Sequence, residues 1–120
     1  MAKAYKNMSI DELIEKYRQG AIIHSDLSDP KMAKKGHNQA YKSGRILRES
    51  QEGREALMNL MEDAEPNVRC WAATQCLQWK PDVARRVLEE LRDSPKLDWW
   101  ISSDADIIMQ QYASGQLKFD

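Results

Sequence analysis

Apolar residues recur at intervals of three and four along the whole chain, and this spacing constrains the fold more than any other feature. It places apolar side chains on one face of an α-helix, whereas a β-strand needs alternation, and alternating β-branched runs are missing. We therefore expect an all-α fold. Turn and capping residues divide the chain into six expected helices, at about residues 9–24, 30–49, 54–62, 66–79, 82–93 and 103–114.

Capping residues mark the starts of the first two expected helices. Ser9 is followed three residues later by Glu12, which is the spacing of a capping box. Residues 25–30 form an expected turn, in which Asp29 is the N-cap and Pro30 occupies the first helical position.

The last helix is expected to begin near Ser103, whose hydroxyl is placed to cap it with Asp106 at the third helical position. It is expected to end near Ser114, because Gly115 suits the left-handed position that follows a helix.

The chain has 120 residues, which predicts one domain spanning residues 1–120. No apolar run is long enough to span a bilayer, and the residues from Met1 to Asn7 are polar, so no secretion signal or membrane partner is expected. Cys70 and Cys76 are expected to be reduced, buried thiols. Together these features favour a cytoplasmic protein.

Charge is distributed unevenly, although the net charge is only −1. Residues 1–48 carry ten Lys and Arg against five Asp and Glu, a balance of +5, and residues 49–120 carry eight against fourteen, a balance of −6. Such asymmetry either marks surfaces for charged partners or is neutralised where the two halves pack together.

The expected helix 30–49 has a basic side and a side of mostly small residues. The small side includes Gly36 and Gly44, which suggests close approach by another element, and His37, which we expect to pack in the core. The basic side is expected to face solvent or an acidic partner, and contact with nucleic-acid phosphates is the alternative. Its residues, called the basic stripe below, are Lys31, Lys34, Lys35, Lys42 and Arg45.

Residues 57–77 carry the sharpest pattern in the chain. Asp63 is placed to accept hydrogen bonds from the start of the following helix, and Ala72 and Ala73 allow another helix to approach closely. This segment resembles one HEAT repeat at its usual spacing. The matching residues are Leu57, Leu60, Asp63, Pro66, Val68, Arg69, Ala72, Ala73 and Leu77.

The resemblance implies an α-α superhelix or solenoid of about six helices, with one clear HEAT-like repeat and a divergent terminal one. The expected helix 82–93 looks like the start of that second unit, but no Val-Arg pair follows it. The chain is also similar to a family of short bacterial HEAT-like proteins of unknown function, through the Asn38 region, residues 68–73, residues 81–88 and Gly115. That similarity implies a non-enzymatic character.

The residues offer little for catalysis. His24 and His37 are the only histidines, and neither has a cysteine or carboxylate at a familiar metal-ligand spacing. The glycines are scattered singly, and Ser102 and Ser103 follow no nucleophile pattern. We therefore expect no catalytic residues, metal or cofactor.

Two groups of residues are candidates for binding a partner. Trp71 lies beside Gln75 on the expected helix 66–79, where it either anchors a partner or packs against a neighbouring helix. Residues 98–106 form either an aromatic surface ringed by acids or a cap on the last repeat, and one of the two adjacent tryptophans is expected to face outward. The candidates in this segment are Asp98, Trp99, Trp100, Asp104 and Asp106.

These features favour a protein-binding module that engages a basic partner through its acidic C-terminal half. A specific version is a bacterial immunity protein that neutralises a toxin domain. The alternative is a nucleic-acid-associated protein that uses the basic stripe.

Overall fold

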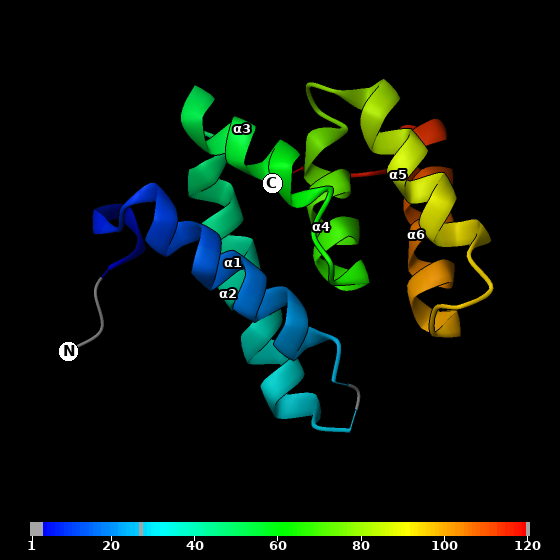
Figure 1. The fold of residues 1–120 in the computed structure, drawn as a ribbon, viewed down its shortest axis with the longest axis horizontal. Coiled ribbons are helices and arrows are strands. Elements are labelled where there is room, and N and C mark those ends of the chain that lie inside the picture. The colour runs from blue at the N-terminus through cyan, green and yellow to red at the C-terminus, as the bar shows by residue number, and fades with distance from the viewer. Residues whose placement is uncertain (1–3, 27, 120) are drawn as a thin grey trace. The chain divides into compact units, whose positions relative to one another are not determined.

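The computed structural model describes residues 4–26 and 28–119, and within these ranges all regular structure is helical, which confirms the all-α expectation. Leu27, in the expected turn 25–30, and Met1 to Lys3 lie outside the described residues. No described helix combines the length and apolar character needed to cross a membrane. The elements are η1 (Tyr5–Asn7), α1 (Ile10–His24), α2 (Pro30–Leu47), α3 (Gln51–Leu60), α4 (Pro66–Cys76), α5 (Pro81–Asp93) and α6 (Trp99–Ala113) (Figure 1).

The chain divides into two compact units, one ending at Asn59 and the other beginning at Leu60. The first unit holds η1, α1, α2 and nearly all of α3, and the second holds α4, α5 and α6. Each unit is therefore described by itself, and the single domain spanning residues 1–120 stays a prediction.

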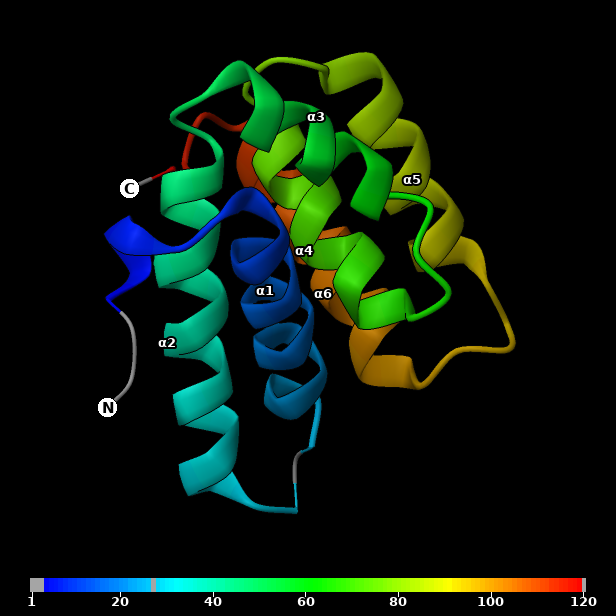
Figure 2. The same cartoon turned by 60° about the vertical axis from the view of Figure 1, so that its left-hand side comes forward.

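Helices α1 and α2 form an antiparallel hairpin and lie side by side (Figure 2). The expected caps are confirmed: the Ser9 hydroxyl accepts from the amide of Glu12 at 3.1 Å, and the Glu12 carboxylate accepts from the amide of Ser9 at 3.0 Å. Asp29 caps α2 by accepting from the amide of Met32 at 3.2 Å. Local signals thus set where both helices of the hairpin begin.

The two helices cross at glycines. A Cβ added to Gly36 would lie 2.6 Å from the carbonyl oxygen of Gly20 and 2.6 Å from the amide nitrogen of His24. A Cβ added to Gly20 would lie 2.6 Å from the carbonyl oxygen of Gly36 and from the amide nitrogen of Ala40. The expected close approach at Gly36 is therefore confirmed, and the helices meet backbone against backbone. The Gln39 side chain adds a tie by donating to the carbonyl of Lys16 at 3.0 Å.

In the second unit, α5 packs against both α4 and α6 (Figure 1). Small residues allow these contacts, since Ala84 and Ala105 are fully buried. The Ser102 hydroxyl donates to the carbonyl of Leu91 at 3.0 Å. This bond satisfies a carbonyl in the last turn of α5 and fixes the rotation of α6 about its own axis.

The turn that leads into α4 is held by two residues of the HEAT-like pattern. Asp63 accepts from the amide of Glu65 at 2.9 Å, as expected from the sequence. The guanidinium of Arg69 donates to the carbonyls of Asp63 at 2.7 Å and Ala64 at 3.2 Å. These charge-assisted bonds tie the first turn of α4 to the preceding loop.

Helix α6 ends as expected. Gly115 has a φ of +77°, and its amide donates to the carbonyl of Tyr112 at 3.2 Å. The amide of Gln116 donates to the carbonyl of Gln111 at 2.8 Å. These two bonds make a Schellman motif, in which glycine adopts the left-handed conformation without steric cost.

Two helix starts differ from the expectation. Helix α6 begins at Trp99 rather than near Ser103, because the chain is already helical where Ile101 is buried, and Ser103 is therefore not a cap. Helix α3 begins at Gln51 rather than at residue 54, because the Ser50 hydroxyl accepts from the amide of Gly53 at 3.0 Å and caps it. The other boundaries lie within about three residues of those expected.

We expect Gly36→Ala to lower the free energy of unfolding by about 2 kcal/mol, because the added methyl group meets backbone atoms that no rotamer change can move. The loss should appear even though alanine favours a helix over glycine by about 1 kcal/mol. Urea unfolding measures the change, with Asn38→Ala, at an exposed position of α2, as the control. If Gly36→Ala is as stable as Asn38→Ala, the helices do not cross as closely as described.

Candidate functional site

Helix α6 exposes two large apolar side chains. Trp99 is 77% exposed and Ile107 is 47% exposed, and a separation of eight residues places them on one side of the helix. Ser103 lies between them, and Asp106 and Gln110 lie beside them, joined by a hydrogen bond of 2.9 Å. These five residues, Trp99, Ser103, Asp106, Ile107 and Gln110, are called the α6 face below.

The other residues predicted in segment 98–106 lie next to this face. Asp98 directly precedes α6 and is exposed. Trp100 is half-buried, so Trp99 is the tryptophan that faces outward, as expected for one of the pair. Trp100 and Asp104 are four residues apart and share a flank of the helix. Burial raises the pKa of Cys70 on α4 to about 12, and the negative charge of Asp104 contributes to this rise. Asp104 therefore lies close to α4.

Trp71 and Gln75, the remaining predicted residues, lie on a different helix, α4. Both are half-buried, in contrast to Trp99. The Oε1 atom of Gln75 is buried and accepts no hydrogen bond from any described residue. The α6 face therefore holds Trp99 and Asp106 of the predicted set, with Asp98, Trp100 and Asp104 as neighbours.

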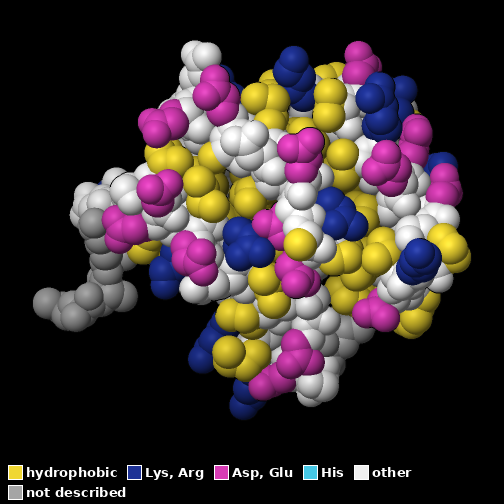
Figure 3. Space-filling view, viewed as in Figure 1, with side chains coloured by type: hydrophobic (Ala, Val, Ile, Leu, Met, Phe, Trp, Pro, Cys, Tyr) yellow, Lys and Arg dark blue, Asp and Glu magenta, His cyan; other side chains and the backbone are white. Residues whose placement is uncertain are grey.

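Electrostatically, the surroundings of the α6 face are acidic. Residues 97–117 contain three aspartates and no lysine or arginine. Arg92 on α5 is close enough to interact with the charge of Asp106, but Asp93 already binds its guanidinium at 2.8 and 3.1 Å. The Arg92 guanidinium also lowers the pKa of Asp93, which keeps that carboxylate ionised. Over α5 itself, by contrast, positive and negative side chains are interspersed (Figure 3).

The basic stripe of α2 is exposed along its whole length. From Lys31 to Arg45 it runs for about 21 Å, since an α-helix rises about 1.5 Å per residue. None of its members forms an ion pair with a described residue. In the first unit, these charges are therefore not neutralised by contacts between side chains.

His37 is exposed, so its expected place in the core is wrong. The glycine crossing brings the backbones together, and there is no room for a ring between the helices. The His37 ring instead lies at the rim of the hairpin, with its centroid 5.2 Å from that of His24 and 6.5 Å from that of Tyr41. His24 itself contacts the carbonyl oxygen of Ala33 through Nδ1 at 3.2 Å.

Two kinds of reactive site, a cysteine thiolate and a metal cluster, can be assessed among the described residues. Burial raises the pKa of Cys70 and of Cys76 to about 12, so neither thiol forms the reactive thiolate at neutral pH. Both cysteines are buried and free, as expected. Among the described residues, no group of three or more His, Cys, Asp or Glu side chains is placed to hold a metal ion.

Sequence reasoning missed Ile107 and Gln110. An expected helix start near Ser103 leaves Trp99 outside the helix, so Ile107 and Gln110 are not assigned to the same face as Trp99. A helix that begins at Trp99 places residues 99, 103 and 107 four apart, so the spacing itself was the signal.

The chain matches no protein-family model, no curated protein and no solved structure. The site is therefore interpreted from its own geometry.

We expect the protein to lose stability as the pH falls below about 6.5, because partial burial, and then the nearby His24, lower the pKa of His37 below its usual 6.5. The folded chain binds this proton more weakly than the unfolded chain, so the stability present above pH 6.5 declines as His37 is protonated. Carboxylates with lowered pKa values, such as Asp93, change the stability of the protein only at lower pH, where they become protonated. The unfolding temperatures of wild type and His37→Gln, measured across this range, test the effect. If the unfolding temperature depends on pH equally in the two proteins, the expectation is contradicted.

Proposed function

We propose that the protein is a non-catalytic binding module that engages a basic protein partner through the α6 face. The observation that carries the proposal is the exposure of Trp99 and Ile107 on one side of a helix whose only charges are acidic. Large apolar side chains that face water on one side of a helix are costly, and a partner that covers them recovers this free energy.

The composition of the α6 face also supports the proposal. Tryptophan is enriched among residues that dominate binding energy, particularly where polar neighbours surround it. Asp98, Asp104 and Asp106 would attract a basic partner and orient it before contact is made. The hydrogen bond between Asp106 and Gln110 restrains both side chains, so less conformational entropy is lost on binding.

A specific form of this proposal is an immunity protein of bacterial origin that covers the active site of a toxin domain. Its test is complex formation between the purified protein and a toxin candidate encoded in an adjacent open reading frame. The absence of a complex would remove the immunity role.

We further propose that the scaffold is HEAT-like, with one clear repeat and a divergent terminal one in an α-α solenoid. The turn before α4 supports this, because Asp63 makes the hydrogen bond expected of it and Arg69, another residue of the pattern, bonds to the same turn. In such a solenoid, α6 would belong to the divergent terminal unit, where repeat proteins differ most from their consensus.

We expect Trp99→Ala to weaken binding to a protein partner isolated from the native host at least about 10-fold, since central aromatic residues often contribute this much to binding. Asp98→Lys should slow association, with an effect that shrinks as salt rises. Partners captured from the native host are identified by mass spectrometry, produced in pure form and titrated by calorimetry.

Val83→Ser is the matched control for Trp99→Ala, because Val83 is 43% exposed on α5, within the same unit. If Val83→Ser weakens binding as much as Trp99→Ala does, or if neither has an effect, the α6 face is not the binding surface.

A second candidate function is binding of nucleic acid through the basic stripe. The observation that favours it is that all five cations are exposed and none is engaged in an ion pair with a described residue. Neutralising phosphates along a row of about 21 Å would release counterions and give affinity without sequence preference.

If this second function holds, Lys34→Glu combined with Lys42→Glu should abolish binding to duplex DNA or tRNA at low salt. Binding by the wild-type protein should fall steeply between about 50 and 200 mM salt. Fluorescence anisotropy measures both effects. Binding that is insensitive to salt, or that survives both substitutions, would count against the basic stripe.

A further inference from the structure

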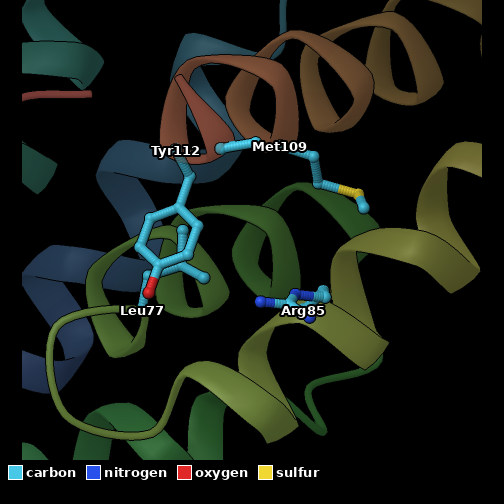
Figure 4. A pocket seen from close by; sticks show the side chains of 5 residues that line it. Leu77, Arg85, Met109 and Tyr112 are labelled. Atoms are coloured by element: carbon cyan, nitrogen blue, oxygen red, sulfur yellow. The ribbon is translucent and has the colours of Figure 1, made fainter. Parts of the chain in front are cut away.

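The second unit contains a hollow that neither proposed function uses. It has a volume of about 550 Å³ and lies where the end of α4 meets α5 and α6. Its lining is mostly apolar, from Leu77, Met109, Ala113 and the ring of Tyr112, and Arg85 of α5 supplies a positive charge. The side chains of Arg85, Met109 and Tyr112 border the same space (Figure 4). Its size is within the range typical of sites for small molecules.

The guanidinium of Arg85, an exposed side chain, contacts no carboxylate of the described residues. Arg85 forms no ion pair or hydrogen bond with any of them. Another arginine of α5, Arg92, is already paired. Its hydrogen bond to Asp93 raises the pKa of Arg92, and the charges of Glu89 and Asp106 raise it further. Arg92 in turn contacts the sulfur of Met109 at 3.9 Å, beside the hollow.

Tyr112 contributes a second polar side chain to the wall of the hollow. The hydroxyl of Tyr112 makes no hydrogen bond to a described residue. A guanidinium offers two parallel donors that match a carboxylate, and a phenol offers one more. The surrounding Leu77, Met109 and tyrosine ring offer contacts for a flat apolar body.

We propose that this hollow binds a small organic anion that has one carboxylate on an apolar, aromatic body. The carboxylate pairs with the guanidinium of Arg85 and accepts from the hydroxyl of Tyr112, and the aromatic body lies against Met109 and Leu77. The site is independent of the α6 face, so either can fail without the other.

The test is a titration of the full chain with 4-phenylbutyrate, followed by the backbone amide resonances in nuclear magnetic resonance spectra. We expect binding with a Kd on the order of 1 mM, because a ligand of this size gains little per atom in a half-open site. The largest shifts should occur at Leu77, Arg85, Met109 and Tyr112. An absence of shifts at these residues up to the solubility limit would overturn the proposal.

Two matched comparisons test the chemistry. The neutral 4-phenylbutyramide should bind at least about 10-fold more weakly, since it lacks the charge that Arg85 recognises. Butyrate, which lacks the ring, should also bind more weakly. Equal binding of the amide would overturn the role of the charge, and equal binding of butyrate would overturn the role of the apolar body.

Arg85→Gln should weaken 4-phenylbutyrate binding about 10-fold, whereas Arg86→Gln should leave it unchanged, because both arginines are exposed on α5 but only Arg85 lines the hollow. Equal losses in both variants would show a nonspecific effect of charge and overturn the site. If Arg85→Gln does not fold, the comparison of carboxylate with amide on the wild-type protein still decides.

Discussion

The absence of side chains at Gly20 and Gly36 is the constraint on which the first unit depends. With Cβ distances of 2.6 Å to backbone atoms, only glycine allows α1 and α2 to meet at this point. Once the small side of α2 faces α1, the opposite side must face outward, and that side carries the basic stripe. The same crossing excludes the His37 ring from the space between the helices and leaves it beside His24 at the rim. In the second unit, burial of Ile101 and Ala105 sets which side of α6 is exposed, and the bond from Ser102 to the Leu91 carbonyl adds to this constraint.

Much of this architecture was predictable because it follows from local interactions. The capping box at Ser9 and the left-handed Gly115 depend on residues within one or two turns, and both were identified from the sequence. The all-helical class followed from apolar spacing for the same reason. The buried state of Cys70 and Cys76 was also predicted from their type and context.

The errors occurred where a residue's role depends on a different helix. Ser103 looked like a cap because it is a serine followed by an acid at the third position, but the chain is already helical at Ile101, which packs in the core. The position of His37 on the small side of the helix favours the core, yet the closeness of the helices leaves no space for its ring. The hollow beside Arg85 could not be predicted, because three helices build it from residues up to 36 positions apart. Side chains that share a surface only after folding leave no periodic signal in the sequence.

The two units carry surfaces of opposite character: exposed cations on one side of α2, and exposed apolar residues among acids on α6. The charge asymmetry of the sequence is thus present on two separate helices, and it gives each proposed function its own surface. Exposing a tryptophan to water by 77% costs free energy, whereas solvated lysines are ordinary on protein surfaces and carry no such cost. This difference in cost is why the α6 face is the preferred binding surface.

Site-specific photocrosslinking in the native host tests this preference most directly. A photoreactive phenylalanine derivative replaces Ile107 on α6 in one strain, Lys34 on α2 in a second and Val83 on α5 in a third. We expect one discrete protein adduct from position 107 and no such adduct from position 83. Adducts to nucleic acid from position 34, with none to protein from position 107, would contradict it.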